Sequence, residues 1–191
     1  MNWETLLCFG DSITIGARSY LGYPEYCGDT LQTQTGKHWM VVNHAVSGYT
    51  TSDLVRSIDQ NWANLMQVRP EVVSLMIGTN DLKSKTSDQD FKIAYSQLLL
   101  KAHLLAGHSN LIVYQIPYLQ EGVMLPYKLE MNRRIDELNS IILDLAHGQG
   151  YLTAKMQSDP SHFFDGVHLN GQGSLAWGKQ LAQKILDLRR G

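Results

Sequence analysis

The sequence is poor in cysteine, with only Cys8 and Cys27 among its 191 residues. Cys8 lies inside an apolar run, whereas Cys27 lies in a segment of helical pattern. Two thiols in such settings provide neither a disulfide framework nor the ligand spacing of a metal-binding motif. We therefore expect Cys8 to face the core.

The chain also lacks long apolar runs and concentrations of charge. No run of about 18 apolar residues is present, which argues against a membrane-spanning helix. The N-terminal residues, MNWETLLCFGDS, have neither the basic start nor the long apolar stretch of an export signal, so we expect a cytoplasmic protein unless such a signal was removed before Met1. The formal net charge is -2 and the lysines and arginines are scattered, whereas nucleic-acid binding needs a concentrated basic face.

The composition is that of an ordinary globular protein. Apolar residues make up 43% of the chain and charged residues 18%, which argues against disorder. A chain of 191 residues can bury one sizeable core. We therefore expect residues 1–191 to form a single domain.

Short apolar runs alternate with longer segments of helical period. Five runs are typical of strands: residues 6–9, 40–46, 72–77, 111–116 and 151–154. Apolar stripes at helical spacing predict amphipathic helices: Leu54, Ile58, Trp62 and Leu65; Phe91 to Leu105; Met131 to Leu145; and Leu181 to Leu188. This alternation predicts a parallel sheet covered by helices on both faces, a three-layer α/β/α sandwich.

Polar or glycine-bearing segments follow four of the predicted strands. They are GDS at 10–12, SGYTTSD at 47–53, GTND at 78–81 and DGVHLN at 165–170. Ligands of open parallel sheets bind beyond the carboxyl ends of the strands. The four segments are therefore predicted to meet at one edge of the sheet and to form the functional site.

These segments contain the groups needed for nucleophilic catalysis. A serine hydroxyl attacks well only when a base removes its proton, and His168 can be that base for Ser12. Asp165, three residues before His168, can orient the imidazole and stabilise its charged form. Negative charge on a reacting carbonyl oxygen also needs fixed donors, for which the candidates are the backbone N–H groups of Ser12 and Gly48 and the side-chain amide of Asn80.

Each segment by itself also has a plainer explanation. GDS and GTND are common in turns and helix caps, Gly48 can supply a positive φ, and His168 can be an ordinary surface histidine. We interpret Asp11 as a structural turn residue, and His162 near Asp165 has no second ligand cluster that would suggest a metal site. In the segment 115–127, the side chains of Tyr118, Met124, Leu125 and Tyr127 can line a pocket wall, although packing on the domain itself is the commoner outcome for loop residues.

Taken together, the segments resemble the SGNH hydrolases, also called the GDSL esterase and lipase family. The resemblance spans nearly the whole chain, through FGDSITIG at 9–16, NHAVSGYTT at 43–51, IGTNDL at 77–82 and DGVHLNGQG at 165–173. It implies Ser12 as nucleophile in a triad with His168 and Asp165, and an oxyanion hole of Ser12, Gly48 and Asn80. It also implies a flavodoxin-like sheet of order 2-1-3-4-5 and no metal or organic cofactor. The family's leucine after the serine is Ile13 here, and the GxSxG elbow of α/β-hydrolases is absent.

The expected function is that of a serine ester hydrolase that forms an acyl-enzyme, with a small-molecule ester as its partner. Short connections between the blocks leave little chain for a lid, so we expect an open cleft and short acyl groups, as in acetyl esters of small or carbohydrate alcohols. Lysophospholipid or acyl-thioester hydrolysis would use the same machinery. The alternative from another class is a non-catalytic domain that binds a small molecule through the same donors.

Overall fold

The fold is built on one parallel sheet, seen in a computed structural model that describes residues 3–18, 20–107 and 110–190. Its strands are β1 (Trp3–Gly10), β2 (His38–Ala45), β3 (Val72–Met76), β4 (Leu111–Tyr114) and β5 (Leu152–Ala154). They pair in the order β2-β1-β3-β4-β5, and every pairing is parallel. The predicted three-layer architecture and strand order are confirmed.

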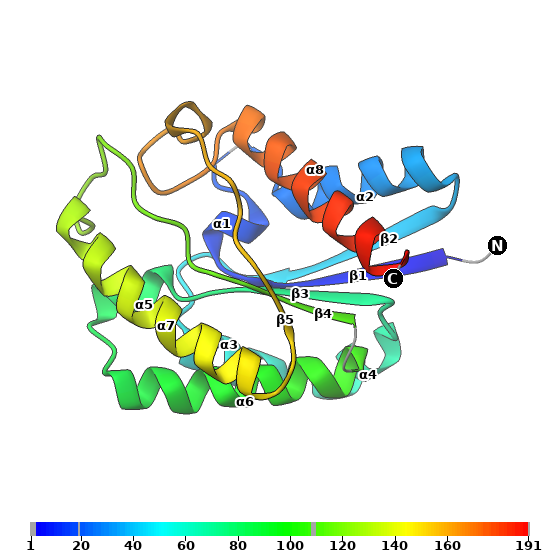
Figure 1. Cartoon of the computed structure of the whole chain (residues 1–191), viewed down its shortest axis with the longest axis horizontal. Helices are drawn as coiled ribbons and strands as arrows, with labels where there is room; N and C mark the ends of the chain where they lie inside the picture. The colour runs from blue at the N-terminus through cyan, green and yellow to red at the C-terminus, as the bar shows by residue number, and fades with distance from the viewer. Residues whose placement is uncertain (1–2, 19, 108–109, 191) are drawn as a thin grey trace.

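Helices cover both faces of this sheet (Figure 1). One face carries α1 (Ser12–Ile15), α2 (Tyr23–Thr35) and α8 (Gly171–Leu188). The other carries α3 (Thr51–Gln60), α4 (Trp62–Val68), α5 (Thr79–Ser84), α6 (Asp88–Ala106) and α7 (Asn132–Gly148). Two short 3₁₀ helices, η2 (Leu129–Met131) and η3 (Pro160–His162), lie in the connections.

The period of the apolar stripe from Leu54 to Leu65 predicts a single helix, but the structure divides this segment into α3 and α4. Asn61 ends α3 and begins α4, with φ −107° and ψ 9°. Its side-chain amide donates to the carbonyl of Ser57 at 2.9 Å, while its own carbonyl accepts the N–H of Leu65 at 3.0 Å. Asn61 thus provides hydrogen-bond partners for the last turn of α3 and the first turn of α4. It can interrupt the helix while the apolar stripe still faces the core.

The core lies between the sheet and its two helical layers. Cys8 and Cys27 are fully buried in it, which confirms the expected setting of Cys8. Burial raises the pKa of both thiols above the usual range, so neither is a reactive nucleophile. Trp177 of α8 is also fully buried and packs against the ring of Tyr23, at 6.0 Å between ring centroids.

Beyond the ends of β4 and β5, side-chain amides take the place of a neighbouring strand. Asn139 of α7 accepts the N–H of Ile116 at 2.7 Å and donates to its carbonyl at 3.0 Å. Gln180 of α8 binds the backbone of Gln157 in the same reciprocal way, at 2.7 and 2.9 Å. These amides hold the segments that leave the sheet next to the helices.

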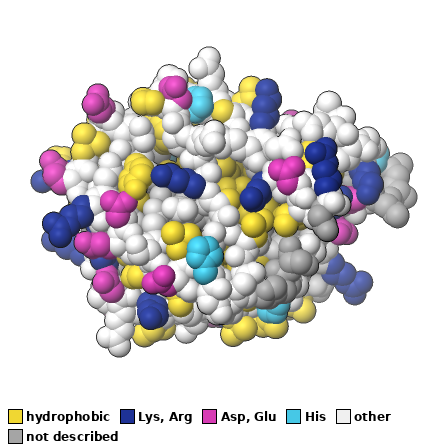
Figure 2. Space-filling view, in the orientation of Figure 1, with side chains coloured by type: hydrophobic (Ala, Val, Ile, Leu, Met, Phe, Trp, Pro, Cys, Tyr) yellow, Lys and Arg dark blue, Asp and Glu magenta, His cyan; other side chains and the backbone are white. Residues whose placement is uncertain are grey.

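The surface mixes charges of both signs. On the face drawn in Figure 2, basic and acidic side chains are interspersed and neither sign forms a continuous patch. Within the described ranges, no helix combines the length and the apolar character needed to cross a membrane.

Candidate active site

The chain turns sharply from β1 into α1, and this turn positions Ser12. Asp11 caps the helix, because its Oδ1 atom accepts the N–H of Ile13 at 3.0 Å. Ser12 is therefore the first residue of α1, at the carboxyl end of β1, which lies between β2 and β3 in the sheet. Its side chain is largely buried, with 8% of the residue exposed.

Ser12, His168 and Asp165 form a continuous chain of hydrogen bonds. The Oγ atom of Ser12 lies 2.9 Å from Nε2 of His168, although 156 positions separate the two residues. The Nδ1 atom of His168 lies 2.8 Å from Oδ2 of Asp165. A serine, its base and an orienting carboxylate are thus arranged in the order that nucleophilic catalysis requires.

The Asp165 carboxylate is held in its charged form by its own loop. Its Oδ1 atom accepts the backbone N–H groups of Val167 at 3.0 Å and His168 at 2.7 Å. Burial acts to raise the pKa of Asp165, but these bonds and the contact with the His168 side chain outweigh it and lower the pKa. Asp165 is therefore ionised at neutral pH and can stabilise a histidinium.

Asn80 of α5 lies beside the nucleophile turn. Its Nδ2 atom donates to the carbonyl of Tyr49 at 2.9 Å and faces Oδ2 of Asp11 at 3.4 Å. Its Oδ1 atom accepts the hydroxyl of Tyr127 at 2.8 Å. The structure thus connects Asn80 to Asp11, the residue next to Ser12, and to a tyrosine whose contact the sequence did not predict.

Asp11 does more than cap a turn, which is the role that its sequence position suggests. It is buried, and burial raises the pKa of its carboxyl to about 6. The N–H of Ile13 and the charge of His168 oppose this shift. Asp11 is thus a second carboxyl group at the site beside that of Asp165, and its charge changes in the weakly acidic range.

Gly48 lies in the turn that follows β2, next to Tyr49, whose carbonyl accepts the Asn80 amide. The N–H of Tyr49 donates to the carbonyl of Val46 at 3.2 Å, and the N–H of Val46 donates to the carbonyl of Gly10 at 3.3 Å. Gly48 has φ +85°, which favours glycine, and no atom lies within 4 Å of the position that a Cβ would occupy. The turn thus leaves open space beside its backbone.

Asp81 joins the segments after β2 and β3, a role that the GTND motif alone did not reveal. Its carboxylate accepts the N–H of Thr51 at 3.0 Å and the Thr51 hydroxyl at 2.8 Å. The only sequence signal was an acidic residue directly after a strand, which a turn explains equally well.

His162 has a structural role. Its Nδ1 atom accepts the N–H of Asp159 at 3.4 Å in a cap of η3, and its carbonyl accepts the N–H of Asn170 at 2.8 Å. In the part of the chain that the structure describes, no group of three or more His, Cys, Asp or Glu side chains is placed to hold a metal ion.

The segment 115–127 behaves differently along its length. Tyr118 and Gln120 line a groove of about 890 Å³, together with Lys155, Gln157 and neighbouring residues. The backbone N–H of Gln120 donates to the carbonyl of Gly166 at 2.8 Å, so the groove adjoins the Asp165–His168 segment. The expected packing on the domain is wrong for two other side chains of the segment, Met124 and Leu125, which are 61% and 78% exposed.

Comparisons with known proteins show what this chain is similar to in sequence and in fold. The GDSL-like Lipase/Acylhydrolase family matches residues 8–176. A variant of an acetyl xylan esterase from Geobacillus stearothermophilus is 24% identical, with 95% of this chain and 94% of that chain covered and a TM-score of 0.72. A lipase/acylhydrolase from Enterococcus faecalis is 21% identical over 95% of both chains, with a TM-score of 0.74. An aryl esterase from M. smegmatis is 20% identical over 97% of this chain and 99% of that chain, with a TM-score of 0.70. At these identities the structures show a shared fold, and the search of curated proteins found no match.

Proposed function

This chain belongs to the GDSL-like lipase/acylhydrolase family, and we propose that it hydrolyses short-chain, acetyl-like esters of small or carbohydrate alcohols through an acyl-enzyme. Family membership makes the protein a carboxylic ester hydrolase. The observation that carries the proposal is the hydrogen-bonded chain from Ser12 through His168 to Asp165.

In the proposed mechanism, the Oγ atom of Ser12 attacks the ester carbonyl carbon while Nε2 of His168 takes its proton. The tetrahedral intermediate collapses, the bond to the alcohol oxygen breaks, and His168 returns the proton to the leaving alcohol. Water then attacks the acyl-enzyme in the same way, releases the acid and restores Ser12. Asp165 stabilises the histidinium in both halves of the reaction.

The proposed oxyanion hole consists of the N–H groups of Ser12 and Gly48 and of Nδ2 of Asn80. Ser12 is the first residue of a helix, where backbone N–H groups have no acceptor within the helix. One amide proton of Asn80 is committed to the Tyr49 carbonyl. On the other side, Nδ2 lies 3.4 Å from Oδ2 of Asp11, which is beyond the usual hydrogen-bond distance. The second amide proton is therefore the one available to an oxyanion.

Two observations support an acetyl-like acyl group and a polar alcohol. The open space beside Gly48 gives a substrate carbonyl access to the turn. The groove of Tyr118, Gln120, Lys155 and Gln157 offers donors and acceptors next to the Asp165–His168 segment, as a carbohydrate alcohol would need. Similar solved structures include acetyl xylan esterases, which are proteins of that substrate class by name.

The test is a panel of p-nitrophenyl esters of increasing chain length, thioesters, lysophospholipids and acetylated sugars, with Ser12→Ala as the blank. We expect the highest kcat/KM for acetyl or butyryl esters and no turnover above the uncatalysed rate by the blank. A maximum at twelve carbons or more would contradict the short-acyl proposal. A phosphonate probe that fails to label Ser12 while ligands still bind would instead favour the non-catalytic binding domain.

A further inference from the structure

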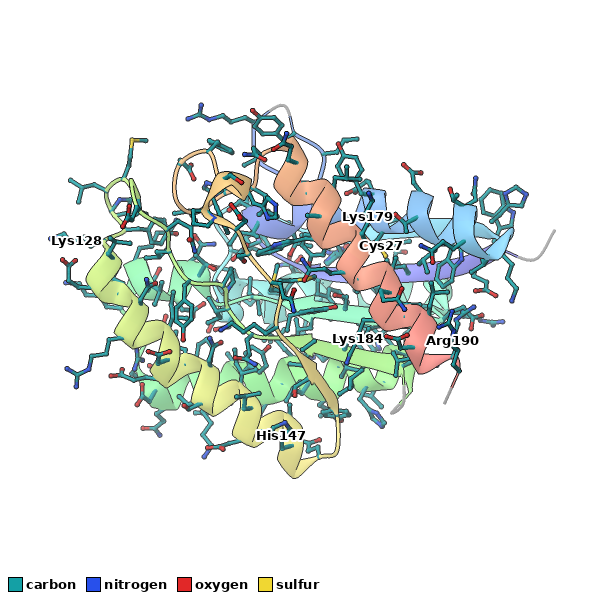
Figure 3. The ribbon with its side chains drawn as sticks, turned by 45° about the horizontal axis from the view of Figure 1, so that its top comes forward. Cys27, Lys128, His147, Lys179, Lys184 and Arg190 are labelled. Carbon is teal, nitrogen blue, oxygen red and sulfur yellow. The ribbon has the colours of Figure 1, made fainter. Side chains whose placement is uncertain are left out.

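Tyr127 is the one buried side chain in a stretch that is mostly exposed, with Val123 half-buried. In residues 121–130, all of which the structure describes, Tyr127 alone is buried, with 9% of its surface exposed. Figure 3 shows the next residue, Lys128, at the outer edge of the molecule, where the chain runs toward α7. Tyr127 therefore anchors this stretch by turning inward, toward the active site.

The phenol of Tyr127 fixes the orientation of an amide. Its hydroxyl donates to Oδ1 of Asn80 at 2.8 Å, while Nδ2 of the same amide donates to the Tyr49 carbonyl at 2.9 Å and lies 3.4 Å from Oδ2 of Asp11. Turning the Asn80 amide over would place Oδ1 against two acceptors and Nδ2 against the phenol. That arrangement leaves buried groups without suitable partners, which is costly.

The Tyr127 hydroxyl stays protonated at the pH values at which the protein is active. Burial raises the pKa of the Tyr127 phenol well above its ordinary value, and the nearby carboxylates of Asp11, Asp165 and Asp81 act in the same direction. A phenol that does not ionise remains a hydrogen-bond donor at every pH at which a serine ester hydrolase is active.

The loop that carries Tyr127 is held in place at its start. The N–H of Leu119 donates to Oδ1 of Asn132 at 2.8 Å, and the amide of Asn132 donates back to the Leu119 carbonyl at 3.0 Å. Gln120 is bonded to Gly166 in the loop of Asp165 and His168. The loop thus connects the base side of the site with the oxyanion side.

We propose that Tyr127 is a positioning residue of the oxyanion hole, whose hydroxyl keeps the Asn80 amide turned so that Nδ2 faces the reacting carbonyl oxygen. This inference rests on the proposed function, because it assigns the orientation of one proposed oxyanion donor. Tyr127 touches Asn80 rather than the substrate in this mechanism, so removing its hydroxyl changes the rate through Asn80 alone.

The test compares Tyr127→Phe with the wild type on p-nitrophenyl acetate, alone and combined with Asn80→Ala. We expect kcat to fall about 2- to 13-fold with little change in KM, the effect of losing one ordinary hydrogen bond. In the Asn80→Ala background, the same change should lower kcat no further, since the amide that it orients is gone. An unchanged kcat in the single variant, or an equal loss in both backgrounds, would overturn the proposal.

Tyr151→Phe is a matched control. Tyr151 is also buried and donates its hydroxyl to a side-chain amide oxygen, that of Gln149 at 3.1 Å. It precedes β5, at the sheet edge opposite the active site. We expect Tyr151→Phe to keep the wild-type kcat, so that a general effect of losing a buried phenol is separated from a positional one.

Two further measurements keep the outcomes distinct. If Tyr127→Phe does not fold, the test uses hydrogen exchange of the Asn80 side-chain amide in the wild-type protein. The Asn80 signals are identified by their loss in Asn80→Ala. We expect these amide protons to exchange with solvent at least about tenfold more slowly than those of a free amide. Exchange at the free rate would overturn the proposal. Activity of Ser12→Ala would instead refute the proposed function, whereas an inactive Ser12→Ala beside a fully active Tyr127→Phe would refute only the role of Tyr127.

Discussion

Asp81 accepts both the backbone N–H and the hydroxyl of Thr51, at 3.0 and 2.8 Å. The two residues lie in α5 and α3, so this pair joins the segment after β3 to the segment after β2. Those segments carry Asn80 and Gly48. Burial raises the pKa of Asp81, and the bonds from Thr51 and Thr86 offset only part of the effect. The pair is therefore a buried contact that fixes the spacing of two proposed oxyanion donors.

Thr51→Val should destabilise the fold and lower kcat moderately. The change removes one donor to a buried carboxylate, which costs about 1–3 kcal/mol in the free energy of unfolding. Urea unfolding and the esterase assay measure the two effects. Thr33→Val, which removes an exposed hydroxyl bonded within α2, should leave both values close to those of the wild type.

Asn80→Ala should lower kcat by about 10² to 10³, the usual effect of losing one oxyanion donor. KM should change much less, because the proposed contact strengthens only as charge develops on the carbonyl oxygen. Steady-state kinetics on p-nitrophenyl acetate measure both constants. Full activity of this variant would remove Asn80 from the mechanism.

Asp165→Asn should lower kcat by about 10⁴ with the fold intact, because an amide at this position favours the wrong tautomer of His168. Circular dichroism and unfolding curves check the fold. Asp159→Asn, an exposed aspartate that caps η3, is the control and should remain active. A small loss in Asp165→Asn would indicate another orienting group.

Gly166→Ala should disturb both stability and activity, because a Cβ there would lie 2.7 Å from the backbone of Val123. Gly122 has a similar positive φ, +81° against +77°, but no atom within 4 Å of the corresponding position. Gly122→Ala should therefore cost only the backbone strain, about 1 kcal/mol. Equal effects on unfolding and on kcat in the two variants would contradict a role of this close contact.

Asp11 should make stability depend on pH. Its carboxyl has a pKa of about 6 in the folded protein, raised by burial from 3.8, so the folded state binds more protons than the unfolded state in this interval. The contribution of Asp11 to the free energy of unfolding is therefore fully present below pH 3.8 and falls as pH rises to about 6. Relative to that of Asp11→Asn, the free energy of unfolding of the wild type should fall by up to about 3 kcal/mol between about pH 4 and pH 7. A difference between the two proteins that does not change with pH would contradict the raised pKa.

Much of the fold follows from sequence periodicity. Apolar runs locate all five strands, and polar segments after four strands locate the sheet edge where Ser12, His168 and Asp165 meet. The ends of elements are less predictable. The fourth apolar run continues to Ile116, yet β4 ends at Tyr114, because the backbone of Ile116 bonds to the Asn139 side chain instead of a strand. An apolar pattern predicts which residues are buried, but it does not predict which groups form hydrogen bonds with their backbone N–H and C=O.

The contacts of the site that the sequence did not reveal share one cause. Tyr127 lies in a segment without a period, 47 positions from Asn80, so no local pattern could pair them. Asp81 and Thr51 each have an ordinary local explanation as turn and helix-start residues. Such side-chain contacts depend on how distant loops approach one another, which is set only when the whole sheet has formed. The catalytic roles of the site residues themselves stay predictions until the variants above are measured.

The reciprocal bonds between Gln180 and the backbone of Gln157 also bear on self-association. Exposed edge strands offer unpaired backbone groups to other molecules, which invites aggregation. β5 is one of the two outer strands of the sheet and is only three residues long, and just beyond it the amide of Gln180 already occupies the N–H and the carbonyl of Gln157. At the β5 edge, a second molecule therefore finds little free backbone along which to extend the sheet.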